Sequence, residues 1–154
     1  MEAPTSELSK LAFEFFYRFS RFEFALKENG YLQNENEGAK ALPGWGRLIG
    51  RYHAEFQFSE AAAQLLTASP KEQYVGHGKQ LVWKKIAIEP NTPQLAQVVR
   101  LLQVVRNNLF HGGKHADRDW ANPDRTMLLL ESCLTVLWEL AELAGITHDF
   151  EGFY

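Results

Sequence analysis

Apolar residues recur at steps of three and four along much of this chain, the spacing that places side chains on one face of a helix. The first such segment covers about residues 6–28 and ends at Asn29 and Gly30, with Thr5 or Ser6 able to cap its start. Its stripe consists of Leu8, Leu11, Ala12, Phe15, Phe16, Phe19, Phe22 and Leu26. A chain patterned in this way is expected to fold as helices around a shared core.

Another helix is expected to start at a well-defined position further along the chain. Thr92 can cap it, and Pro93 would occupy its first position, where a missing N–H does no harm. The adjacent glycines Gly112 and Gly113 mark its end. Its apolar face consists of Leu95, Val98, Val99, Leu102, Val105 and Leu109. This face is therefore predicted to be buried in the core.

The last long helix also begins with a capping residue followed by proline, here Asn122 and Pro123, and Gly145 ends it. Two apolar stripes run along it, so only a narrow polar face remains. A helix with such a wide apolar surface needs neighbours on two sides. One neighbour is the core of the domain, and the other is either more of that core or a second subunit.

The remaining segments are less regular. A helical region is expected over residues 47–68, and Ser59 is a place where it can kink. Residues 30–46 are typical of a loop, and residues 81–88 fit a short strand, a helical turn or an irregular packed segment equally well. No internal repeat or linker divides the chain. We therefore expect one domain over residues 1–154, an all-α bundle of four to five helices.

Composition excludes several classes of protein. Apolar residues make up 45% and charged residues 23% of 154 residues, which argues against a disordered chain. The single cysteine, Cys133, cannot form an internal disulfide, and no apolar run approaches the roughly 20 residues that span a bilayer. The N-terminus lacks the pattern of a signal peptide. A cytoplasmic protein without a membrane segment is expected.

Charge is unevenly distributed along the chain. The net charge is -3, yet residues 61–125 hold nine Lys and Arg residues against five Asp and Glu residues. A local basic region on an acidic protein fits a confined phosphate site. The alternative is that helix surfaces simply differ in charge.

The segment from Arg106 to His111 carries the strongest chemical signal. Arg106 falls on an apolar stripe, where a charge needs a partner or a task, and His111 directly precedes the double glycine. A fixed cation beside an imidazole is the minimum equipment for cleaving RNA without a metal. A similar arrangement, Arg47 with His53, lies at a glycine-rich helix start and is the weaker candidate.

Geometry sets a condition on this pair. Five steps along an ideal helix turn the two side chains about 140° apart and separate them by about 7.5 Å along the axis. They converge only if the last turn of the helix unwinds, or if two chains assemble the site. In a two-fold dimer each motif would meet its own copy.

The stretch from Arg106 through Asn107 to His111 and Gly112 resembles the signature of HEPN domains, the higher eukaryote and prokaryote nucleotide-binding family. That signature is an arginine, four to six residues and a histidine, usually with a polar residue directly after the arginine. Residues 19–27 also resemble the first helix of bacterial HEPN proteins. The resemblance implies a helical domain and a dimeric, metal-independent endoribonuclease, a toxin or defence effector that a cognate antitoxin protein can accompany.

Each candidate residue has a distinct expected role. His111 would transfer protons, and Arg106 would hold the scissile phosphate of RNA. Supporting or phosphate-binding contacts are expected from Asn107, Asn108, Lys114 and His115, and an orienting carboxylate from Glu23. His53, His77 and His148 lack the paired spacing of a metal site, so no metal or other cofactor is expected.

Other interpretations remain open at this point. Arg106 could serve only to tie its helix to a carboxylate such as Glu23, and His111 could be an ordinary histidine at the negative end of a helix dipole. The whole chain could be a non-catalytic HEPN module that binds a nucleotide, RNA or a partner protein. It could also be a helical adaptor that dimerises through its last helix.

Overall fold

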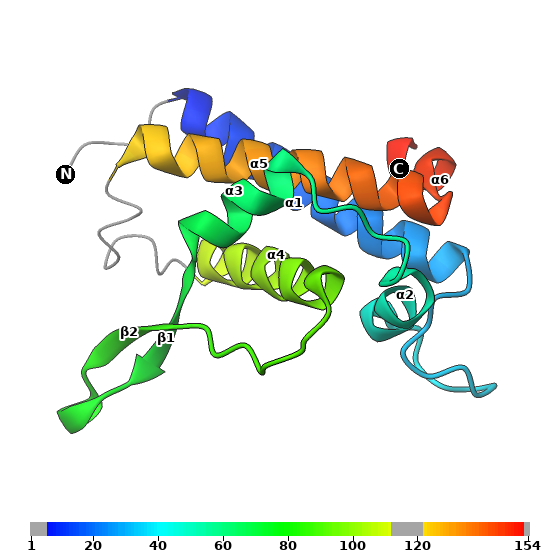
Figure 1. Ribbon diagram of the computed structural model, residues 1–154, viewed down its shortest axis with the longest axis horizontal. Helices are drawn as coiled ribbons and strands as arrows, with labels where there is room; N and C mark the ends of the chain where they lie inside the picture. The colour runs from blue at the N-terminus through cyan, green and yellow to red at the C-terminus, as the bar shows by residue number, and fades with distance from the viewer. Residues whose placement is uncertain (1–5, 112–121, 153–154) are drawn as a thin grey trace.

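The computed structural model describes residues 6–111 and 122–152, and their fold is mostly helical (Figure 1). In chain order the elements are α1 (Ser6–Glu28), α2 (Trp45–Tyr52), α3 (Glu60–Ala68), β1 (Lys71–Val75), a 3₁₀ turn (His77–Lys79), β2 (Leu81–Lys85), α4 (Gln94–Phe110), α5 (Pro123–Ala144) and α6 (Thr147–Glu151). The two longest helices, α1 and α5, pack side by side and run in the same general direction. The helices α2, α3, α4 and α6 pack around this pair.

Aromatic rings of α1 form the centre of the core. Phe15 and Phe22 are fully buried, and the Phe22 ring stacks on Trp45 of α2 with centroids 4.9 Å apart. Phe150 of α6 meets the same Phe22 ring edge-on at 5.9 Å. Phe22 therefore joins α1, α2 and α6.

The wide apolar surface of α5 is covered within the chain. It packs against α1 and α3, and the fully buried side chains of its two stripes include Leu130, Leu137, Cys133 and Val136. Ser132 is buried as well, and its hydroxyl donates to Gln64 Oε1 of α3 at 2.8 Å. More of the same core is therefore one neighbour of this helix.

Local signals located most helix ends correctly. The Asn122 side chain accepts from the Arg125 N–H at 3.3 Å, and Gly145 follows α5 with a left-handed φ of 67°. At α4 the expected start was off by one residue. Thr92 donates its hydroxyl to the Glu89 carbonyl at 2.6 Å instead of capping, and Pro93 is the residue that precedes the helix.

The region expected to be one helix over residues 47–68 is two helices. α2 ends at Tyr52 and α3 begins at Glu60. Ser59 lies directly before α3 and its hydroxyl accepts from the Ala62 N–H at 3.1 Å. Ser59 is thus the N-cap of a new helix rather than a kink.

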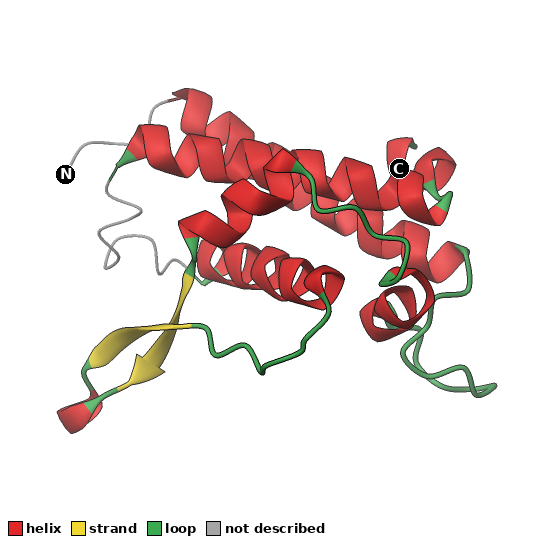
Figure 2. Cartoon of the chain, viewed as in Figure 1, coloured by secondary structure: helices red, strands yellow, loops and turns green. Residues whose placement is uncertain are grey.

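The expectation of an all-α chain was wrong for residues 71–85, which form an antiparallel hairpin of β1 and β2 (Figure 2). Gly78 adopts a φ of 61° in the turn between the strands. Asn108 of α4 donates its amide to the Lys71 carbonyl at 2.8 Å, and Arg100 of α4 pairs with Glu72. The base of the hairpin is therefore attached to α4, while the exposed side chains of Val75 and Leu81 lie near its far end.

Cys133 is fully buried in the core, and burial raises the pKa of its thiol. No helix among the described residues is both long enough and apolar enough to cross a membrane.

Candidate functional site

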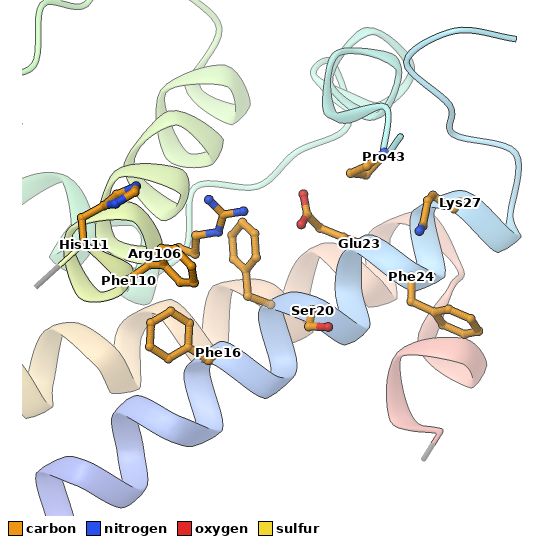
Figure 3. A pocket seen from close by; sticks show the side chains of 10 residues that line it. Phe16, Ser20, Glu23, Phe24, Lys27, Pro43, Arg106, Phe110 and His111 are labelled. Atoms are coloured by element: carbon orange, nitrogen blue, oxygen red, sulfur yellow. The ribbon is translucent and has the colours of Figure 1, made fainter. Parts of the chain in front are cut away.

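A cavity of about 510 Å³ lies between α1 and the C-terminal end of α4 (Figure 3). Arg106 and His111 both line it. The opposite wall comes from α1, and Pro43 of the loop before α2 closes one side. The two residues that the sequence singled out therefore share one cavity within a single chain.

The end of α4 explains how both side chains reach this cavity. The last helical residue is Phe110, and His111 stands at the C-cap with φ -87° and ψ 5°, outside the regular helical region. Arg106 lies one turn earlier, and its long side chain extends along the helix surface. In the view of Figure 3 its guanidinium lies between the His111 ring and the Glu23 carboxylate.

Arg106 is held by two contacts. Its Nη1 donates to the side-chain oxygen of Asn107 at 2.5 Å, and its Cζ lies 5.5 Å from the centroid of the Phe19 ring. The side chain is half-buried, so one side of the guanidinium remains in contact with the cavity. Asn107 thus orients the guanidinium.

The expected pairing of Arg106 with Glu23 was wrong. The ion pairs found among the described residues are Arg47–Glu35, Arg51–Glu55 and Arg100–Glu72. Glu23 Oε2 instead accepts from the Trp45 indole N–H at 2.8 Å, because that mostly buried donor needs an acceptor. The Glu23 carboxylate still lines the cavity, so its charge acts on the site without touching the guanidinium.

The other supporting residues have different outcomes. Asn108 is buried and holds β1 through the Lys71 carbonyl, so it is a structural residue and does not line the cavity of Arg106. Lys114 and His115 lie outside the described residues. Arg47, from the weaker candidate pair, forms a surface ion pair with Glu35 at 3.5 Å.

His111 is exposed and makes an edge-on contact with the Phe110 ring, with centroids 5.2 Å apart. Its imidazole also borders a second, smaller cavity next to the hairpin. Within residues 6–111 and 122–152, no group of three His, Cys, Asp or Glu side chains could hold a metal ion.

Sequence reasoning missed two polar residues of the cavity, Ser20 and Lys27. Both lie on α1 with Glu23, at spacings of three and four residues, so they follow one another along a single helix face. A polar row beside the apolar stripe of the first helix was therefore visible in the sequence. Its link to Arg106 was not, because that link depends on how α1 packs against α4.

Gly44 supports the loop that closes this cavity, and Gly44→Ala should destabilise the protein by about 1–3 kcal/mol. A Cβ at this position would lie 2.6 Å from the Leu32 carbonyl carbon and 2.8 Å from its amide nitrogen, both in the backbone. Urea denaturation would measure the change. Gly50→Ala is the matched control, because a Cβ there meets nothing within 4 Å and a helix interior favours alanine. Equal stability of the two variants would contradict the tight approach of the loop to Leu32.

Comparison of the chain with protein-family models, with curated proteins and with solved structures gives no match.

Proposed function

We propose that this protein is a metal-independent endoribonuclease of the HEPN type and that it cleaves RNA at the cavity shared by Arg106 and His111. The observation that carries the proposal is the presence of a guanidinium and an imidazole on one cavity wall. The Asn107 contact supports it further, because a phosphate-binding arginine works best when its orientation is fixed before the substrate arrives.

The chemistry follows from the properties of these two groups. An imidazole can both take and give a proton near neutral pH. His111 removes the proton from a ribose 2′-OH, whose oxygen then attacks the adjacent phosphorus. The bond from phosphorus to the 5′-oxygen breaks, and that oxygen receives a proton from a second group, which acts as a general acid. A second His111, in a homodimer, would fill the other of the two proton-transfer roles.

Arg106 stabilises the negative charge that develops on the phosphate. Its planar donors can bind two phosphate oxygens at once. Lys27 adds a second positive charge to the cavity, and Glu23 adds a negative one. The Glu23 carboxylate already accepts from Trp45, and the two positive groups, Arg106 and Lys27, outnumber this single negative charge where a phosphate would bind.

Purified protein incubated with RNA and a chelator tests the proposal. We expect shorter RNAs that end in a 2′,3′-cyclic phosphate, with a 5′-hydroxyl on the other fragment, and we expect DNA of the same sequence to stay intact because it lacks the 2′-OH. Mass spectrometry of the products reads the ends directly. Cleavage of DNA, or RNA that remains intact in every buffer, would contradict the proposal. In the second case, binding of RNA without cleavage would identify the non-catalytic module considered above.

A further inference from the structure

A second cavity, of about 250 Å³, lies between the hairpin and α4, and His111 borders it as well as the larger one. β1 contributes Glu72 and Gln73, β2 contributes Trp83, and Asn107 comes from α4. Asn107 is the residue that holds Arg106. The two cavities therefore share His111, and Asn107 connects the smaller cavity to Arg106.

The indole N–H of Trp83 lacks a hydrogen-bond partner among the described residues. Its Nε1 is also buried. Buried donors are almost always paired, so a donor left open beside a cavity calls for an explanation. Trp83 lines the cavity, so a ligand that brings an acceptor there and shifts the indole slightly would supply the missing partner.

The lining also indicates what kind of ligand fits. The amides of Gln73 and Asn107 offer hydrogen-bond donors and acceptors, and Val104 adds an apolar surface. The Glu72 carboxylate is already paired with Arg100. No Lys or Arg of the described residues lines the cavity, so it suits a neutral, hydrogen-bonding group rather than a phosphate.

We propose that this second cavity binds one unpaired nucleobase of the RNA whose phosphate lies at Arg106 and His111. This inference rests on the proposed function and extends it to the substrate class. A ribose joins the phosphate and the base of every nucleotide, and two adjoining cavities that share His111 match that connection. Because a base within a duplex cannot leave its stack without cost, the site selects single-stranded RNA.

Binding of 2′-deoxy trinucleotides tests the inference apart from cleavage, because these ligands lack the hydroxyl that the reaction needs. We expect at least one base type to bind about tenfold more tightly than an abasic trinucleotide of equal charge, measured by calorimetry. Trp83→Phe keeps an aromatic ring, though a smaller one, and removes the N–H, so it should weaken binding of that ligand by about five- to tenfold and leave the abasic ligand unchanged. Gln73→Leu should act in the same direction.

The controls separate the possible outcomes. Trp138→Phe changes an exposed tryptophan on α5, away from both cavities, and should bind every trinucleotide as the unaltered protein does. Circular dichroism checks that each variant is folded. If Trp83→Phe is unfolded, Gln73→Leu tests whether the cavity binds a base. If folded variants of both residues prefer the base as strongly as the unaltered protein, the inference fails even where RNA is cleaved. Base binding without RNA cleavage would instead support the inference and contradict the proposed function.

Discussion

Replacement of His111 by Ala should lower the rate of RNA cleavage by about 10²- to 10⁴-fold, the range that a positioned proton-transfer group contributes. His111 is exposed at the end of α4, and its described contact is the ring of Phe110. Its removal should therefore leave the melting temperature nearly unchanged. A single-turnover assay with a fluorescent RNA measures the rate, and the stability readout separates a chemical defect from unfolding.

Arg106→Ala should lower the same rate by about 10²- to 10³-fold, because a lost donor to the developing charge costs that much in comparable sites. Arg106→Lys keeps the charge but cannot make the two parallel bonds that a guanidinium makes, so it should restore only a small part of the activity. Asn107→Ala should weaken cleavage less than either variant, since it removes only the group that orients the guanidinium.

The chain offers its own control for this experiment. Arg47 and His53 have a similar separation along the chain, yet Arg47 forms a surface ion pair with Glu35. Arg47→Ala and His53→Ala should cleave RNA at the original rate. If the Arg106 and His111 variants were as active as these two, the proposed site would be wrong.

Local signals made the helices predictable, because a cap or a left-handed glycine acts on its own neighbours. Asn122 and Gly145 are examples, and both bracket α5 as expected. Whether the hairpin segment is strand or helix could not be predicted in this way, since a short apolar run fits a strand or a helical turn equally well. What selects the strand is its pairing with residues 71–75 and the attachment of Lys71 to Asn108, which are contacts between distant parts of the chain.

Some features of the site could also be predicted from the sequence, and others depend on packing. The structure places Arg106 and His111 on one cavity, although five steps of an ideal helix turn their side chains apart. This shared site could be predicted from their position at a helix end and from the resemblance to the HEPN signature. The partner of Arg106 could not, because Glu23 has a competing donor in Trp45 that only the packing of α2 on α1 brings into reach. Asn107, the residue next in sequence, is the partner instead.

Phe22→Ala should destabilise the protein by about 3–5 kcal/mol, the usual cost of removing a buried ring. Phe22 is fully buried, and its ring contacts Trp45 and Phe150, so the cavity that the substitution leaves is bordered by three helices and cannot easily collapse. At about 2–4 °C per kcal/mol for a chain of this size, the melting temperature should fall by roughly 6–20 °C. Differential scanning calorimetry measures this change.

Phe13→Ala provides the matched control, because it makes the same substitution on the same helix at a side chain that is 74% exposed. It should change stability by less than about 0.5 kcal/mol. Because Phe22 stacks on Trp45 and Trp45 holds Glu23, Phe22→Ala should also loosen the wall of the RNA cavity, so cleavage at a temperature where the variant is folded should fall while Phe13→Ala leaves it unchanged. Melting temperatures of the two variants that agree within error would show that α1 does not bury this face against α2 and α6.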